Sequence, residues 1–271
     1  MSETPRTHRT DQNDVHAELD LAAPPERIWS FLVDPAELVR WFPLEAEVDP
    51  RVGGKLAMGW SNQGFRGEAE ISAFQPGERL ELVAQMPIGD DMRSLVQAFE
   101  LSANGSGGTT LRLTHSGFGD GAAAEGFSRA VERGWAFELF GMQHYLTHHD
   151  GADREVVYAQ IDLDGSPADA WTALLGDNGP FVEGAPQQGE VVNVALTSEY
   201  FDVRVVELWP GEGLSGVVEE LNHAYFRILV DPSPGSPDQT RMSLWLSTYG
   251  LEQARRDELE QAFEGGLFAL S

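Results

Sequence analysis

The chain of 271 residues contains no cysteine and a single lysine. Without cysteine it forms no disulfide, and it holds no iron–sulfur cluster, cysteine-bound zinc or thiol nucleophile. No apolar run approaches the roughly 18 residues that a membrane-spanning helix needs. The opening residues 1–14 are polar and lack the apolar core of a signal peptide. We therefore expect a cytoplasmic protein.

Positive charge is also scarce. The sequence has 44 Asp and Glu residues against 18 Lys and Arg residues, for a formal net charge of -26. So much negative charge repels phosphate backbones and anionic lipid surfaces, so we expect neither nucleic acid nor a membrane as a partner. Because arginine replaces lysine almost everywhere, the composition favours adaptation to a salty interior. The alternative interpretation is an acidic mesophilic protein.

The charge imbalance leads to a prediction about salt. Mutual repulsion among surface carboxylates destabilises the compact state, and added salt screens that repulsion. We therefore expect the melting temperature to rise as salt is added into the molar range. Thermal unfolding at increasing salt concentration checks this, and an unchanged melting temperature would contradict the interpretation as salt adaptation.

Hydrophobic residues make up 41% of the chain and aromatic residues 10%, which suffices for ordinary packed cores. The sequence also contains an internal repeat. The segment VHAELDLAAPPERIWSFL, which begins at Val15, aligns without gaps with VYAQIDLDGSPADAWTALL, which begins at Val157. The alignment matches Pro25 with Pro167 and Trp29 with Trp171. The repeat indicates two copies of one structural unit.

A second pair of matching segments follows in the same order. QPGERL begins at Gln75 and WPGEGL at Trp209, at a smaller spacing than the first pair. The second copy has therefore lost residues between these blocks, where the first copy carries DPAELVRWFP and RVGGKLAMGW. We find no clear counterpart of Trp41 or of Gly53 and Gly54 there, so a ligand pocket in the second copy is doubtful.

Periodicity indicates the elements of each copy. Residues 15–21 alternate between apolar and polar, which predicts a half-buried strand, and Pro25 begins a short helix. Five further stretches with a period of two lie between residues 56 and 115, separated by turn residues. From Phe127 to Leu146 the period becomes helical. The second copy closes with a similar helix pattern from Leu259 to Leu270.

These elements predict an α+β fold in which a curved antiparallel sheet wraps around a long C-terminal helix, present twice in tandem. We expect a disordered N-terminal tail over residues 1–13, a first domain over 14–150 and a degenerate second domain over 151–271. A concave sheet and one helix do not fill all the space between them, so the fold favours an apolar cavity.

The first copy resembles a known family. The stretches PPERIWSFLVDPAELVRWFP, RVGGKLAM, FRGEAEISAFQPGERLEL, TTLRLTHSGF and GWAFELFGMQHYL are similar to the helix-grip, or START-like, superfamily, in the branch of the C-terminal domain of activators of the Hsp90 ATPase. The resemblance implies a helix-grip fold, whose members include lipid and hormone carriers, aromatic polyketide cyclases and chaperone regulators. The sequence departs from the family in having Trp41 and Phe42 where paired tryptophans are common.

The candidate pocket lies in the first copy. Its walls are predicted from inward positions of the strands and of the closing helix, with Gln97 and His115 as polar groups. The apolar members are Trp41, Met58, Trp60, Phe99, Phe118, Trp135, Leu139 and Met142. The alternative interpretation of these side chains is simple core packing, which is common for aromatic and methionine residues.

The sequence shows no catalytic signature. His115 could hydrogen-bond or transfer a proton, or it could be an ordinary histidine of a strand end. His144 and His148 are one helical turn apart, but HYLTH lacks the glutamate of the metalloprotease motif. Dinucleotide and phosphate-loop motifs and the GxSxG elbow are absent. We predict no catalytic residue, no bound metal and no cofactor.

The leading functional hypothesis is a non-catalytic START-like protein. Either it binds a small apolar or aromatic ligand in the first copy, or it assists a chaperone or another protein. The alternative is a cyclase-like or hydrolase-like enzyme that uses a polar group of the same pocket. The second copy could cover the first, which would make the chain a monomeric pseudo-dimer, or the chain could form a homodimer.

Overall fold

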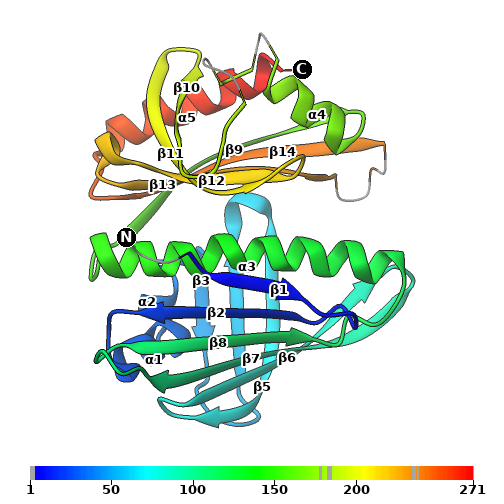
Figure 1. Cartoon of the computed structure of the whole chain (residues 1–271), viewed down its shortest axis with the longest axis vertical. Coiled ribbons are helices and arrows are strands. Elements are labelled where there is room, and N and C mark those ends of the chain that lie inside the picture. Colours follow the sequence, from blue (N-terminus) through cyan, green and yellow to red (C-terminus); the bar gives the residue numbers. More distant parts are fainter. Residues whose placement is uncertain (1–3, 177–178, 182–184, 234–235, 237, 271) are drawn as a thin grey trace. The chain divides into compact units, whose positions relative to one another are not determined.

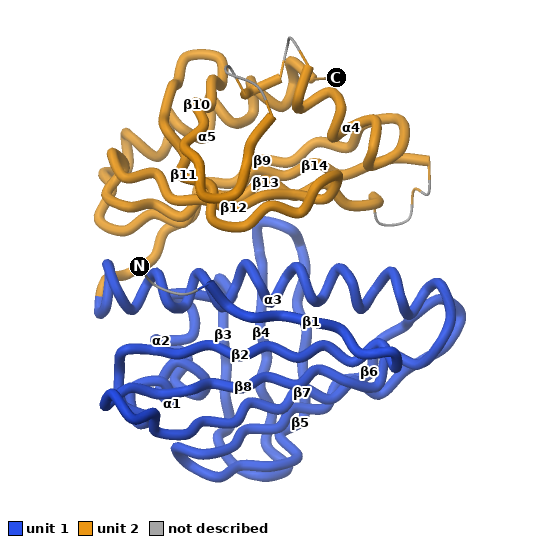
Figure 2. The backbone as a smooth tube through the Cα atoms, in the orientation of Figure 1, with its two compact units in different colours: residues 1–151 blue, residues 152–271 orange. Residues whose placement is uncertain are grey.

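A computed structural model describes residues 4–176, 179–181, 185–233, 236 and 238–270. The chain divides into two compact units, residues 1–151 and 152–271 (Figure 2). Each unit combines one antiparallel sheet with one closing helix (Figure 1). This is the α+β arrangement, present twice in tandem, that the periodicity predicts.

The first unit begins with strands β1 and β2, continues through two short helices and a meander of strands, and ends in one long helix. The bounds are β1 Arg6–Arg9, β2 Val15–Leu21, α1 Pro25–Val33, α2 Pro35–Leu38, β3 Glu45–Val48, β4 Lys55–Trp60, the 3-10 turn η1 Ser61–Gln63, β5 Phe65–Gln75, β6 Arg79–Ile88, β7 Asp91–Ala103, β8 Thr109–Ser116 and α3 Ala122–His148.

The sheet of the first unit has the order β1-β2-β8-β7-β6-β5-β4-β3, and every neighbouring pair is antiparallel. Helix α3 contacts β1 and β2 at one end of this order and also β6 in its middle. One straight helix reaches strands this far apart only where the sheet curves around it. The side chains between the concave face and α3 form the interior of the unit.

The second unit repeats this plan in shorter form. Its elements are β9 Arg154–Asp164, α4 Pro167–Leu174, β10 Val191–Leu196, β11 Glu199–Trp209, β12 Gly213–Val218, the 3-10 turn η2 Glu219–Leu221, β13 Ala224–Pro232, β14 Gln239–Tyr249 and α5 Gln253–Phe268. The sheet order is β10-β11-β12-β13-β14-β9, and α5 contacts both edge strands, β10 and β9. This sheet also curves around its helix.

The two copies correspond in fine detail. The PGE segments both form the turn of a hairpin, between β5 and β6 and between β11 and β12, with Gly77 at φ 79° and Gly211 at φ 84°. Only glycine adopts such angles without strain. Both hairpins also carry a β-bulge at the matching place, between Ile71 and Ala73 and between Val205 and Glu207. A shared bulge is a feature of a family rather than of chance.

The predicted loss of residues in the second copy also appears. In the described part of that unit, no element between α4 and β10 corresponds to α2 or β3 of the first unit. The first unit therefore has a longer wall beside its closing helix.

The N-terminal segment differs from the prediction. Residues 1–13 were expected to be a disordered tail, but Arg6–Arg9 forms β1 and pairs with β2. Arg9 donates a hydrogen bond from Nε to Glu132 on α3 at 3.0 Å, and Asn13 donates to the carbonyl of Gly119 at 2.9 Å. A four-residue strand at a sheet edge is too short to show an alternating pattern, so the sequence carries no signal for it. Residues 1–3 of the tail lie outside the described residues.

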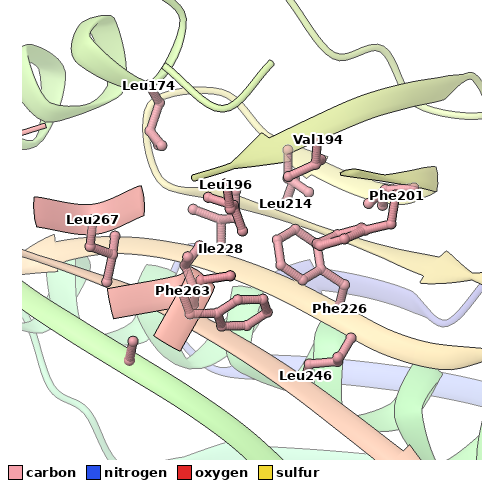
Figure 3. Packing of buried hydrophobic residues seen from close by; sticks show 14 of the residues in the cluster. Leu174, Val194, Leu196, Phe201, Leu214, Phe226, Ile228, Leu246, Phe263 and Leu267 are labelled. Atoms are coloured by element: carbon pink, nitrogen blue, oxygen red, sulfur yellow. The ribbon is translucent and has the colours of Figure 1, made fainter. Parts of the chain in front are cut away.

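The core of the second unit fills the space between sheet and helix. Phe201 on β11, Phe226 on β13 and Phe263 on α5 are 3%, 0% and 0% exposed, and their ring centroids lie 5.6 to 6.5 Å apart (Figure 3). Edge-to-face and tilted contacts at this distance are favourable for aromatic rings. These three rings therefore occupy part of the space between the sheet and the helix of the second unit. In the described part of the chain, no helix has the length and apolar character to span a bilayer.

Candidate functional site

The first unit contains an apolar cavity of about 190 Å³ at the concave face of its sheet. Strands β4 to β8 provide most of its wall, Phe42 covers it from the segment after α2, and two residues of α3 contribute from the helix. The lining residues are Phe42, Met58, Trp60, Phe65, Gly67, Glu68, Ala69, Leu82, Ala84, Met86, Leu95, Gln97, His115, Phe127 and Val131.

A chain of aromatic rings runs along the cavity from solvent to interior. Phe65 is 50% exposed, and its ring centroid lies 5.8 Å from that of Trp60. Trp60 contacts Phe42 at 5.4 Å, and Phe42 contacts Trp135 at 5.4 Å. Trp135 reaches His115 at the inner end. Phe65, Trp60 and Phe42 therefore present aromatic edges and faces to the cavity, which suit a flat aromatic molecule.

The polar atoms at the inner end come from two neighbouring strands. His115 on β8 lies directly opposite Gln97 on β7, and both side chains line the cavity. Trp135 on α3 donates from Nε1 to Nδ1 of His115 at 3.2 Å. Because Nδ1 accepts this bond, the neutral ring carries its proton on Nε2. No atom of the described residues accepts a hydrogen bond from Nε2, which is buried.

His115 is uncharged near neutral pH. The side chain is 5% exposed, and burial lowers its pKa to about 4 because the charged imidazolium loses its hydration. The ring packs against Phe118 at 5.0 Å and lies among apolar groups. At physiological pH it therefore offers a neutral N–H donor and no positive charge.

The chain must turn sharply after this histidine. Gly117 follows β8 with φ 95°, and a Cβ atom there would lie 2.3 Å from the carbonyl oxygen of Ser94. Only glycine fits this approach. The turn brings Phe118, which is fully buried, back against His115.

Charge is nearly absent from the cavity. Of the described residues that line it, only Glu68 is ionisable besides His115. Glu68 is half-exposed and forms an ion pair with Lys55 of β4, with 2.6 Å between its carboxylate oxygen and Nζ. No arginine or lysine lines the cavity in the described chain, so a buried anion would find no countercharge there.

The structure brings some of the predicted pocket residues together and separates others. Met58, Trp60, Gln97 and His115 line the cavity. Trp41 and Phe99 instead line an adjoining void of about 20 Å³, which has room for about one water molecule.

Four predicted residues line neither the cavity nor the adjoining void. Leu139 and Met142 are fully buried further along α3, where sheet and helix close together. Phe118 and Trp135 lie behind His115 and orient it. Trp41 likewise has a structural contact, since its Nε1 donates to the carbonyl of Phe31 at 3.0 Å.

Several lining residues were not predicted as part of the site. Phe127 and Val131 occupy the first half of α3, and their helical spacing already placed them on the inward face. Ala84, Met86 and Leu95 share the strand alternation of the predicted residues. Phe65 shares the alternation of β5 with Ala69, whereas Phe42 had no such signal because it lies outside the strands and helices.

The histidines at the end of α3 form a cluster without a metal site. The ring centroids of His144 and His148 lie 4.7 Å apart, and His149 lies 5.6 Å from His144. Across the described residues, no group of three or more His, Asp and Glu side chains has an arrangement that could hold a metal ion. Phe140 stacks on His144 instead.

Similar proteins are found by family and by structure. Residues 22–147 match the family model described as Activator of Hsp90 ATPase homolog 1-like protein. No curated protein matches the chain. Protein MLL2253 from Mesorhizobium loti is 22% identical with a TM-score of 0.45, over 51% of this chain and 98% of its own.

Two further solved structures are similar. The di-domain ARO/CYC BexL from the BE-7585A biosynthetic pathway is 13% identical with a TM-score of 0.46, over 95% of this chain and 97% of its own. The Aha1 dimer from Colwellia psychrerythraea is 18% identical with a TM-score of 0.43, over 49% of this chain and 95% of its own.

The family match spans most of the first unit, from the end of β2 to the last turn of α3. Residues 22–147 of the first unit therefore match the Activator of Hsp90 ATPase homolog 1-like family, and this unit has a helix-grip fold that the second unit repeats in shortened form.

Proposed function

We propose that the first unit binds one small, uncharged aromatic molecule in its cavity. The observation that carries the proposal is an apolar space of about 190 Å³ with aromatic walls. A dry, apolar cavity of about 150 Å³ is known to hold benzene. The space here suits a molecule of one or two rings, and the half-exposed ring of Phe65 stands where such a molecule would enter.

Binding is favoured over acid–base catalysis. A general acid or base works best when its pKa lies near the working pH. Burial lowers the pKa of His115 to about 4, so this imidazole would remain a neutral donor during turnover. Glu68 pairs with Lys55 at the exposed side of the cavity. These features support a binding role for the site.

Filling the cavity tests the proposal. Ala84 lines the space, and the exchange Ala84→Phe adds a ring to it. We expect naphthalene to bind the wild-type chain, as measured by calorimetric titration, and the variant to bind at least about tenfold more weakly, which corresponds to about 1.4 kcal/mol. Ala103 lies exposed on β7, so Ala103→Phe is the matched control and should bind like the wild type. Equal affinity in all three proteins would contradict the proposal, as would no binding to the wild type.

A second candidate is contact with a chaperone, and the family match favours it. That role uses an outer surface rather than the cavity. Binding of the purified chain to Hsp90, measured by surface plasmon resonance, tests it. If this role holds, the chain binds Hsp90, and Ala84→Phe leaves the affinity unchanged because the substitution is internal.

A further inference from the structure

The inner end of the cavity carries a hydrogen-bond donor that the fold does not use. Nδ1 of His115 already accepts a hydrogen bond from Trp135. Nε2 is therefore the ring nitrogen that can hydrogen-bond to a ligand in the cavity. This atom is buried, and no atom of the described residues accepts from it. A buried N–H group without an acceptor costs about 1–3 kcal/mol, which an acceptor on a ligand would recover.

The arrangement holds the donor in place. The indole of Trp135 can only donate, so it requires Nδ1 of His115 to be an acceptor and thereby keeps the proton on Nε2. Trp135 in turn packs against Phe42 and Phe99, with ring centroids at 5.4 and 5.7 Å. Trp135 is therefore a positioning residue for the donor, and its contacts fix the side of the imidazole that faces a ligand.

The chemistry of the site narrows the class of ligand. A carboxylate would accept from Nε2, but a buried anion needs a countercharge, and the other ionisable side chain that lines this cavity is the acidic Glu68. A phenol would bring an O–H group of its own, and the Gln97 amide would then have to present its oxygen rather than its N–H group to the ligand. A ketone accepts a hydrogen bond and carries neither a charge nor a donor.

We propose that the cavity selects uncharged aromatic ketones of one or two rings, whose carbonyl oxygen accepts a hydrogen bond from Nε2 of His115. This inference rests on the proposed function, since it names the class of ligand for the same cavity. Gln97 stands opposite His115 in the sheet, and its amide N–H group is a second donor available to the same oxygen.

A pair of probes separates the ketone contact from the apolar contact. Indane and 1-indanone share one bicyclic skeleton, and only the second has a carbonyl group. We expect His115→Phe to raise the ratio of the dissociation constants, 1-indanone over indane, on the order of tenfold, because the carbonyl loses its donor. His16→Phe, on the neighbouring strand β2 and outside the cavity, is the control and should leave the ratio unchanged.

A second variant and a spectroscopic measurement cover the case in which His115→Phe does not fold. Trp135→Phe leaves His115 in place but removes the donor to Nδ1, so we expect a smaller rise in the same ratio. The carbonyl stretching band of bound 1-indanone should lie at lower wavenumber in the wild type than in this variant. Suppose that the wild type binds indane, but that the ratio of dissociation constants in both variants and the carbonyl band equal those of the wild type. The ketone inference is then wrong, and the apolar site stands. If neither probe binds the wild type, both proposals are wrong.

Discussion

The exchange Phe263→Ala is expected to lower the free energy of unfolding of the second unit by about 3–5 kcal/mol. Phe263 is fully buried on α5 and contacts Phe201 and Phe226 between sheet and helix (Figure 3). Removal of the ring takes away its burial and leaves a cavity that the curved sheet cannot close. The two aromatic contacts are part of this loss, at about 0.5–1.5 kcal/mol each.

Hydrogen exchange measured by mass spectrometry checks this expectation unit by unit. Protection should fall in β13 and β14, while the amides of β7 and β8 in the first unit keep theirs. The control is Phe268→Ala, on the same helix but 75% exposed, for which we expect a change within about 0.5 kcal/mol. Equal effects of the two exchanges would mean that Phe263 is not part of a packed core.

The second large effect is a pH dependence of stability from His115. Burial lowers the pKa of this histidine from 6.5 to about 4 in the folded chain. Below pH 6.5 the unfolded chain therefore takes up a proton that the folded chain does not. Stability from this group is complete above pH 6.5 and is lost as the pH falls toward 4. Between about pH 7.5 and about pH 5 the expected loss is on the order of 2 kcal/mol.

Chemical denaturation of the wild type and of His115→Phe at both pH values measures this contribution. The variant loses the acceptor of the Trp135 hydrogen bond, which costs stability equally at both pH values. Carboxylates elsewhere titrate alike in the two proteins and cancel in the difference. The variant should therefore lose less stability than the wild type on acidification. Parallel changes in the two proteins would show that His115 protonates as readily in the folded chain as in the unfolded one.

The two predicted effects reflect a difference in packing between the two units. In the first unit, the space between sheet and helix remains partly open, and the buried Nε2 of His115 has no partner there among the described residues. In the second unit, three phenylalanine rings occupy the space between sheet and helix. The ligand site is therefore proposed for the first unit alone, and the second unit is a packed, shortened copy of the same fold.

Local periodicity was sufficient to predict most elements. The strand Val15–Leu21 has the predicted bounds, and the closing helix spans Ala122–His148 as its apolar spacing indicates. Elements of this kind are encoded by neighbouring residues, because one face of each must be apolar. The repeat, its matching PGE turns and the shortened second copy were also visible in the sequence.

The position and the lining of the cavity follow from the tertiary structure alone. The sequence placed Leu139, Met142, Phe127 and Val131 on one helix face, but it did not tell which turns of α3 face open space and which are packed. That depends on how far the sheet curves away from the helix, a property of many strands together. Pairing of β1 at the sheet edge depends in the same way on a neighbour that is remote in sequence.

For His115, too, the sequence predicts the position of the side chain, while the tertiary structure sets its tautomer and its pKa. Strand alternation put the side chain on the inward face with Leu111 and Leu113, since a period of two fixes the side of the sheet. Its place opposite Gln97 comes from the register of β7 and β8. Its tautomer comes from Trp135, and its low pKa comes from burial among rings of β8, α3 and the turn between them. Composition determined the acidic surface, the absence of thiol chemistry and the residue types available for a site. Only long-range packing set the distances and the desolvation that give one of those residues its chemistry.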